Sequence, residues 1–138
     1  MQTKYKQMTK DFEGLELKVY RCPSGKLTIG YGRNLEDNGI TKQEADMLFE
    51  RDFATAEAQA RVLVTSLGKN WIKFPEQRLY VLTDMIFNMG YTNVLKFKKT
   101  LAAIKADDYD KAAKEMLDSD WARQTGRRAT TLAALMRG

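Results

Sequence analysis

The sequence predicts an α+β fold that is mainly helical, with a small N-terminal β-hairpin lobe joined by a long helix to a helical C-terminal lobe. Two β-prone runs flank the turn Pro23-Ser24-Gly25, a helical pattern then continues from 41 to 67 without Gly or Pro, and shorter helical patterns fill the remainder. A chain of 138 residues suits a single domain. We expect a small lobe at about 13–40, an inter-lobe helix at about 41–67, and a helical lobe at about 68–138 that also includes 1–12.

The N-terminal stretch predicts a helix over 3–13. Tyr5, Met8 and Phe12 fall on one helical face, and Gly14 follows as a stop signal. Leu17–Tyr20 and Leu27–Ile29 then read as two strands, because Pro presets φ and Gly supplies a positive φ between them. Glu13 is therefore expected just before the first strand of a hairpin.

The long helix has a clear start signal. Asn38-Gly39 predicts a turn, and Thr41 followed by Glu44 predicts a capping box, in which each side chain bonds a free backbone amide of the other residue. Gly68 is the predicted end. Apolar spacing and turn residues then predict further helices at 77–89, at 97–106, from Asp107 or Asp108 to 117, around Trp121, and at 127–136.

Composition narrows the class of partner. The net charge is +5, and most of it lies from Lys96 onward, which favours nucleic acid, an acidic membrane or an anionic bacterial wall. Cys22 is the single cysteine, so the chain forms no disulfide with itself, which fits synthesis in a reducing compartment. No stretch is apolar enough for a membrane span, and the first ten residues contain no apolar core of a signal peptide.

Three side chains around the hairpin are the candidate catalytic group. Cys22 follows Glu13 by nine positions, Thr28 follows Cys22 by six, and pairing of the strands is expected to bring Cys22 and Thr28 together across the turn. A carboxyl group that faces a second acid or base is the usual arrangement for cutting glycosidic bonds. The alternative is a purely structural hairpin that follows a solvated Glu at a helix end.

This stretch resembles the active-site signature of the phage-type lysozymes, glycoside hydrolase family 24. The family pattern is Glu, then Asp or Cys nine positions on, then Thr six further, and it ends in T-I-G-x-G, which here is Thr28-Ile29-Gly30-Tyr31-Gly32. Further segments resemble the family at its entry into the long helix, at Phe87-Asn88-Met89-Gly90 and at Trp121-Ala122-Arg123-Gln124-Thr125. The loop after Gly32 is shorter than in the T-even phage enzyme.

The resemblance implies roles for individual residues. Glu13 is expected as the general acid, while Cys22 and Thr28 are expected to handle the attacking water or to stabilise charge. The T-even enzyme carries an Asp at the position of Cys22, so a structural role for this thiol, with Thr28 alone holding the water, stays an alternative. Arg127 or Arg128 is expected to pair with Glu13. The expected substrate-binding residues are Asn34, Phe87, Thr100 and Glu115.

The resemblance also implies a function. We expect a peptidoglycan hydrolase, a muramidase that cleaves the β-1,4 bond between N-acetylmuramic acid and N-acetylglucosamine without metal or cofactor. As an endolysin it would act as a monomer on peptidoglycan, with no nucleic-acid partner and no stable membrane insertion. It would stay in the host cytoplasm until a separate permeabilising protein releases it to the wall. The alternatives are a lytic transglycosylase and a catalytically weak, cationic wall-binding protein.

Overall fold

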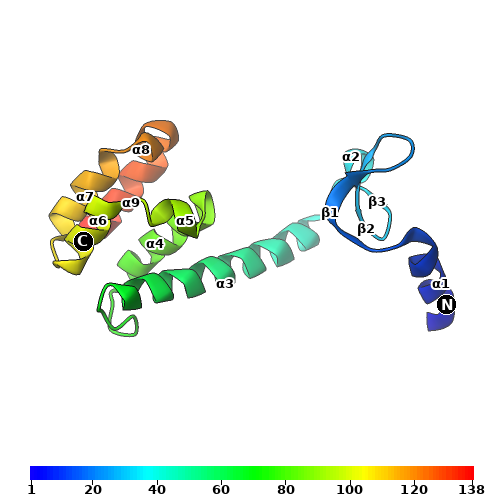
Figure 1. Cartoon of the computed structure of the whole chain (residues 1–138), viewed down its shortest axis with the longest axis horizontal. Coiled ribbons are helices and arrows are strands. Elements are labelled where there is room, and N and C mark those ends of the chain that lie inside the picture. Colours follow the sequence, from blue (N-terminus) through cyan, green and yellow to red (C-terminus); the bar gives the residue numbers. More distant parts are fainter. The chain divides into compact units, whose positions relative to one another are not determined.

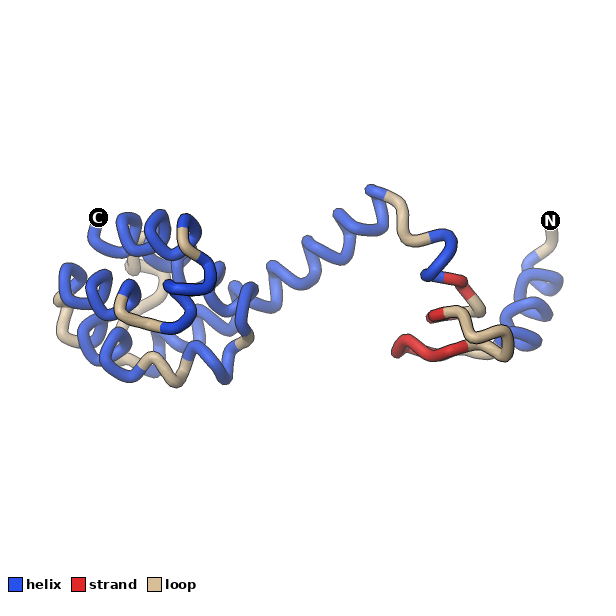
Figure 2. The backbone as a smooth tube through the Cα atoms, turned by 90° about the horizontal axis from the view of Figure 1, so that it is seen from above, coloured by secondary structure: helices blue, strands red, loops and turns tan.

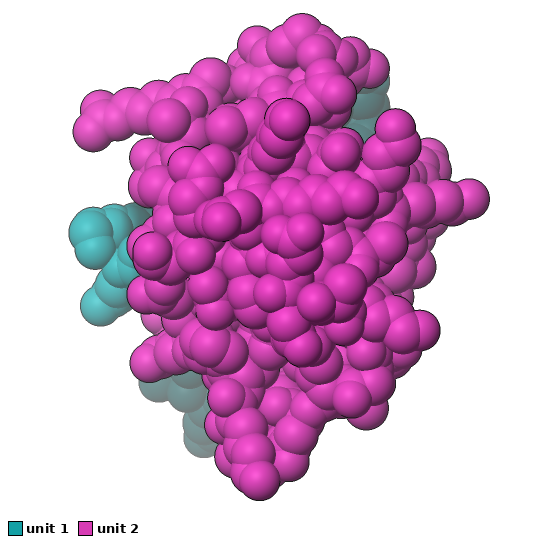
Figure 3. All heavy atoms as spheres, turned by 90° about the vertical axis from the view of Figure 1, so that its left-hand side faces the viewer, with its two compact units in different colours: residues 1–47 teal, residues 48–138 magenta.

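The computed structural model describes all 138 residues and confirms the predicted fold class (Figure 1). The chain forms two compact units, Met1–Met47 and Leu48–Gly138, which Figure 3 colours separately. All strands belong to the first unit, and the second is helical (Figure 2). No helix in the chain combines the length and the apolar character that crossing a membrane requires.

The first unit is a small antiparallel sheet flanked by helices. The strand order is β1-β2-β3. Its elements are α1 (Thr3–Glu13), β1 (Glu16–Arg21), β2 (Leu27–Gly30), β3 (Arg33–Asn34) and α2 (Leu35–Asn38). The helix, the hairpin and the turn at 23–25 agree with the prediction from sequence.

The hairpin ladder ends just before Cys22, although Cys22 and Thr28 still come close enough for a side-chain hydrogen bond, as predicted. Thr28 pairs with Tyr20, and Leu27 pairs with Arg21, so Cys22 lies beyond the end of β1 rather than in the ladder. The Cys22 amide instead donates to the Lys26 carbonyl at 2.9 Å. A five-residue turn therefore closes the hairpin, and Cys22 belongs to that turn.

The segment between Arg33 and Gly39 is more ordered than its sequence suggested. Two residues pair with β2 as a third strand, and a four-residue helix follows. The Asn34 side chain caps this helix by accepting the Asp37 amide at 3.0 Å. Elements this short contain too few residues for a hydrophobic period, which is why the sequence pattern did not predict them.

The long helix α3 (Lys42–Ser66) begins at the predicted capping box. The Glu44 amide donates to the Thr41 hydroxyl at 3.1 Å, and the Thr41 amide donates to the Glu44 carboxylate at 2.9 Å. Arg33 pairs with the same carboxylate at 2.7 Å and also donates to the Gly39 carbonyl at 3.1 Å. These contacts join β3 to the first turn of α3.

The second unit contains the apolar core of the chain. Beyond α3 its helices are α4 (Glu76–Met89), α5 (Tyr91–Val94), α6 (Lys98–Lys105), α7 (Tyr109–Leu117), α8 (Asp120–Thr125) and α9 (Arg127–Arg137). The largest fully buried apolar side chains are Leu63, Leu82, Met85, Ile104, Met116 and Met136. Burying each of these contributes about 1.5–3 kcal/mol, so this unit has a core of its own.

Arg78 of α4 closes the end of α9. Its guanidinium donates to the carbonyls of Met136 at 2.7 Å and Arg137 at 2.9 Å, and it lies 3.7 Å from the centre of the Tyr109 ring. The last carbonyls of a helix lack partners within the helix, and a cation there also complements the helix dipole. Arg78 therefore fastens the last helix to α4.

Candidate active site

Glu13 is the last residue of α1 and its side chain is exposed. The helix ends there because Gly14 adopts a positive φ while its amide donates to the Lys10 carbonyl at 2.8 Å. The Glu13 carboxyl group lies directly against Gly32, which has no side chain to displace it. An exposed carboxyl beside a backbone turn is accessible to an approaching substrate.

Cys22 opens the hairpin turn and is half-exposed. The Gly25 amide donates to the Cys22 carbonyl at 2.8 Å, which folds the turn so that the Ser24 hydroxyl lies 3.0 Å from the Cys22 Sγ. The hydrogen bond from Ser24, helped by the backbone at Lys26, lowers the pKa of the Cys22 thiol to about 7. A substantial fraction of the thiol is therefore thiolate at neutral pH.

Thr28 is the one buried residue of the first unit, with 3% of its surface exposed. Its hydroxyl donates to the Lys26 carbonyl at 2.8 Å. The same hydroxyl lies near the Cys22 thiol and makes a smaller contribution to lowering its pKa. Lys26 thus bonds both candidate residues through its carbonyl, because Cys22 donates to the same oxygen.

Asn34 lies opposite Thr28 in the pairing of β2 with β3. Its side chain is engaged with Asp37, accepting from the Asp37 amide and donating to the Asp37 carboxylate at 2.8 Å. The sheet therefore places Asn34 next to the candidate catalytic residues. The same side chain serves as the cap of α2.

The other predicted substrate-binding residues belong to the second unit. Phe87 stands in an exposed group of three phenylalanines with Phe49 and Phe53, whose ring centres lie 5.5 and 6.4 Å from its own. Phe87 keeps 39% of its surface exposed, and Phe49 keeps 48%. An aromatic surface of this kind can stack against sugar rings.

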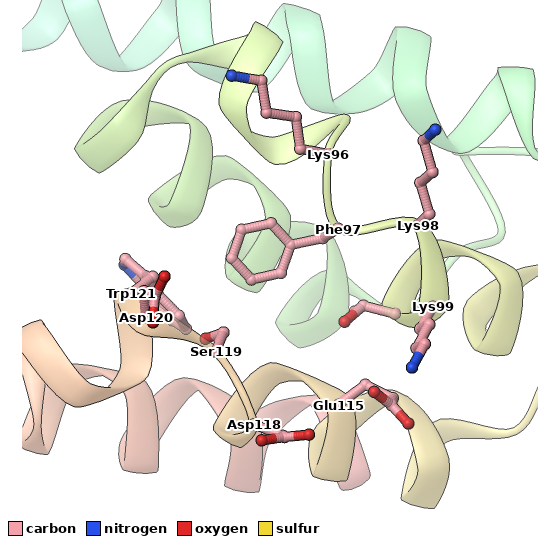
Figure 4. Close-up of a pocket in the computed structure, with 10 residues that line it drawn as sticks. Lys96, Phe97, Lys98, Lys99, Glu115, Asp118, Ser119, Asp120 and Trp121 are labelled. Carbon is pink, nitrogen blue, oxygen red and sulfur yellow. The ribbon is translucent and has the colours of Figure 1, made fainter.

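Thr100 and Glu115 line one pocket of about 440 Å³ (Figure 4). Its wall consists of Lys96, Phe97, Lys98, Lys99, Thr100, Glu115, Asp118, Ser119, Asp120 and Trp121. Cations come from the start of α6 and carboxylates from the end of α7 and the start of α8. Phe97 packs edge-on against Trp121, whose indole donates to Asn88 at 2.8 Å. The pocket therefore offers an aromatic floor between groups of opposite charge.

Arg128 makes a bidentate ion pair with Asp84 of α4, at 2.8 and 3.0 Å. The hydrogen bond to Asp84 raises the pKa of Arg128, so the guanidinium stays charged at every pH of interest. Arg127 makes no such pair. The predicted pairing of one of these arginines with Glu13 stays a prediction.

No group of three or more His, Cys, Asp or Glu side chains is placed to hold a metal ion.

Glu13, Cys22, Thr28 and Asn34 all lie in the first unit, whereas Phe87, Thr100 and Glu115 lie in the second. Two neighbours of the candidate catalytic residues were missed by sequence reasoning, namely Ser24 beside Cys22 and Gly32 beside Glu13. The contact of Ser24 could have been predicted from the sequence, since a hydroxyl two residues after a cysteine in a turn is within reach of the cysteine sulfur. For Gly32 the sequence offered only its position in the T-I-G-x-G pattern, which does not indicate a contact with Glu13.

Comparison with known proteins identifies the family of the chain. The model of the family described as phage lysozyme matches residues 10–137. The chain belongs to the phage lysozyme family. This membership supports a peptidoglycan hydrolase of the glycoside hydrolase class and confirms the resemblance noted in the sequence.

Individual relatives span different lengths. The chain is 30% identical to the probable T4-type lysozyme 1 of Dictyostelium discoideum, covering 99% of this chain and 95% of that protein. It is 30% identical to an endolysin of Acyrthosiphon pisum secondary endosymbiont phage 1, covering 94% of this chain and 86% of that protein. It is 32% identical to the pre-baseplate central spike protein Gp5 of Enterobacteria phage T4, where 94% of this chain matches only 27% of that longer protein.

Proposed function

We propose that this phage lysozyme family member is a muramidase that hydrolyses the β-1,4 bond between N-acetylmuramic acid and N-acetylglucosamine in peptidoglycan. The observation that carries the proposal is the Glu13, Cys22 and Thr28 signature on one hairpin unit of a phage lysozyme family member, with an exposed carboxyl group and a thiol whose pKa is lowered. Glycoside hydrolysis needs an acid for the leaving oxygen and a second group for the water.

Each residue has a defined step in the proposed reaction. Glu13 gives its proton to the glycosidic oxygen as the bond from that oxygen to the anomeric carbon breaks. A water oxygen then bonds to the anomeric carbon, and the Cys22 thiolate accepts the proton that the water releases. Thr28 accepts a hydrogen bond from that water through a lone pair of its hydroxyl oxygen. No metal or cofactor takes part in these steps.

The wall polymer is the proposed ligand of the remaining residues. Asn34 lies beside Thr28 in the sheet, Phe87 offers an exposed ring, and Thr100 and Glu115 lie in the charged pocket of the second unit. We propose that these residues contact the sugar chain or its peptide branches. The excess of positive charge favours binding to an anionic wall.

Host-cell lysis is the proposed biological role. A relative named endolysin supports it. In this role the enzyme is made in the host cytoplasm and reaches the wall when a separate protein permeabilises the membrane.

The test is clearing of purified peptidoglycan by wild type, by Glu13→Gln and by Glu16→Gln, which removes a neighbouring exposed carboxylate. We expect Glu13→Gln to lose clearing by a factor of about 100 or more, because removing a general acid typically lowers rates 10²- to 10⁴-fold. Glu16→Gln should clear like wild type. Mass spectrometry of the fragments should find reducing ends.

Other outcomes would assign the protein differently. Anhydro ends would make it a lytic transglycosylase, since that reaction proceeds without water. Wall binding by wild type and Glu13→Gln alike, without clearing by either, would make it a wall-binding protein. Equal clearing by wild type and Glu13→Gln would remove Glu13 from the mechanism.

A further inference from the structure

We propose that Gly32 is a positioning residue that sets where the Glu13 carboxyl group stands. The inference rests on the proposed function, because it assigns a role to the neighbour of the proposed general acid. A Cβ built on Gly32 would overlap Oε2 of Glu13 and would stand 2.9 Å from its carboxyl carbon. The carboxyl therefore occupies the space that any side chain at position 32 would take.

The turn at Gly30–Gly32 is fixed on both sides. Before it, Gly30 pairs with Glu16 of β1, and Ile29 pairs with Arg33 across the turn itself. After it, Arg33 is tied to the Glu44 carboxylate and the Gly39 carbonyl. The backbone at Gly32 therefore has little freedom to retreat from a collision.

Glu13 is the partner that can move. Its carboxyl group is the end of a flexible, exposed side chain, so a methyl group at position 32 would push it aside rather than displace the backbone. The last turn of α1 also meets this turn through Lys10, whose ammonium lies 5.0 Å from the centre of the Tyr31 ring. The contact between Lys10 and Tyr31 thus also brings the last turn of α1 against the turn that contains Gly32.

The chain provides a matched control for backbone strain. Gly32 has φ +72°, and Gly30, two residues earlier in the same turn, has φ +71°. Alanine is strained at both positions, since a positive φ disfavours any Cβ. A Cβ at Gly30, however, meets nothing within 4 Å. The two alanine variants therefore differ mainly in whether they displace Glu13.

The experiment compares Gly32→Ala with Gly30→Ala in the full chain. The midpoint temperature of thermal unfolding should fall by similar amounts in the two alanine variants. The 13C signal of the Glu13 carboxyl carbon, assigned by its loss in Glu13→Gln, should shift in Gly32→Ala and keep its position in Gly30→Ala. In kinetics on peptidoglycan, Gly32→Ala should lower kcat by about 10- to 100-fold relative to Gly30→Ala with little change in KM, because a displacement of about 1 Å can cost 10²-fold.

The outcomes separate the inference from the proposed function. An unmoved carboxyl signal in Gly32→Ala would overturn the positioning role, and so would equal kcat in the two alanine variants when Glu13→Gln has lost its activity. A shifted signal and a selective fall in kcat would establish it. If the signal shifts while Glu13→Gln retains full activity, Gly32 still positions Glu13, but Glu13 is not the general acid.

Discussion

The thiol of Cys22 differs from a carboxylate in one respect that matters at neutral pH, because its charge depends on its hydrogen bonds. A thiol with an ordinary pKa of about 8.5 is mostly neutral at pH 7. The Ser24 hydroxyl and the Lys26 backbone bring the pKa of Cys22 to about 7, so a large fraction carries the negative charge that a carboxylate would supply. Ser24 thus allows a cysteine at this position to carry a negative charge near neutral pH.

Replacing Ser24 should raise the pKa of Cys22. In Ser24→Ala the largest cause of the lowered pKa is gone, so the pKa of Cys22 should rise from about 7 toward the ordinary value of a thiol. Iodoacetamide reacts only with the thiolate, so the rate of Cys22 alkylation at pH 7 should fall several-fold in Ser24→Ala. The pH at which this rate is half-maximal should rise. Because Cys22 is the single cysteine, mass spectrometry reads this reaction without ambiguity.

Two variants complete this measurement. Ser24→Thr retains a hydroxyl and should keep the low midpoint. Ser66→Ala removes a serine of α3 that bonds the Leu63 carbonyl, and it should leave Cys22 unchanged. An identical midpoint in wild type and Ser24→Ala would mean that the hydroxyl does not stabilise the thiolate. If the midpoint rises while clearing at pH 7 is unchanged, Cys22 does not act as a thiolate in the reaction.

The residues that support the site were harder to predict than the site itself. Glu13, Cys22 and Thr28 have a fixed spacing within one short stretch, so a sequence pattern is enough to select them. The contact between Glu13 and Gly32 depends on how the end of α1 meets the turn after β2, which no local period records. The capping role of Asn34 was not predicted either, because the helix that Asn34 caps is too short to be predicted from the sequence.

Helices were predictable from the sequence where they have capping residues and are long enough to show a hydrophobic period. The helix α3 begins at the Thr41 capping box and ends within a residue of the predicted bound, because caps and periodicity both specify it. Asp108 likewise caps α7 through the Lys111 amide at 3.1 Å. The exact strand pairing of the hairpin was not predictable in the same way, because the five-residue turn depends on the hydrogen bonds at Lys26 rather than on residue types.

The start of α3 should depend on pH through Glu44. The hydrogen bonds from Thr41 and the charge of Arg33 lower the pKa of Glu44 below its ordinary value of 4.5. A carboxyl group with a lowered pKa in the folded protein stabilises it above the unfolded pKa, and this contribution is lost as the pH falls through the folded pKa. The stabilisation by Glu44 is therefore present at pH 7, decreases as the pH falls below 4.5, and is lost once the pH is below the lowered pKa.

Urea unfolding of wild type and Glu44→Gln over pH 3 to 7 measures this effect. Wild type should be more stable at pH 7, and the difference should shrink as the pH falls below 4.5. Thr41→Ala should destabilise the protein by about 0.5–2 kcal/mol at pH 7, which is usual for loss of a Ser or Thr cap. A difference between wild type and Glu44→Gln that is constant over this range would show that the charge of Glu44 makes no contribution.

At the scale of the whole molecule, apolar burial is distributed very unevenly. Every buried hydrophobic side chain lies between Ala56 and Met136, and the first unit buries only Thr28. Ordering a residue costs about 1–2 kcal/mol in backbone entropy, which burial of apolar side chains normally offsets. A three-stranded sheet without a buried apolar face is not expected to be stable alone. The candidate catalytic residues therefore belong to the part of the chain with the least burial of its own.

This distribution predicts different behaviour for two fragments. Residues 1–47 alone should be unfolded, with little amide dispersion in an NMR spectrum, because no apolar core offsets the entropy of ordering them. Residues 48–138 should retain helical circular dichroism and unfold cooperatively on heating, because they contain the whole apolar core. Ile104→Ala in that fragment should lower its stability by about 2–5 kcal/mol, the usual range for emptying a buried site. A dispersed spectrum from 1–47 would mean that its backbone and polar contacts, including those of Arg33 with Glu44, suffice to fold the site.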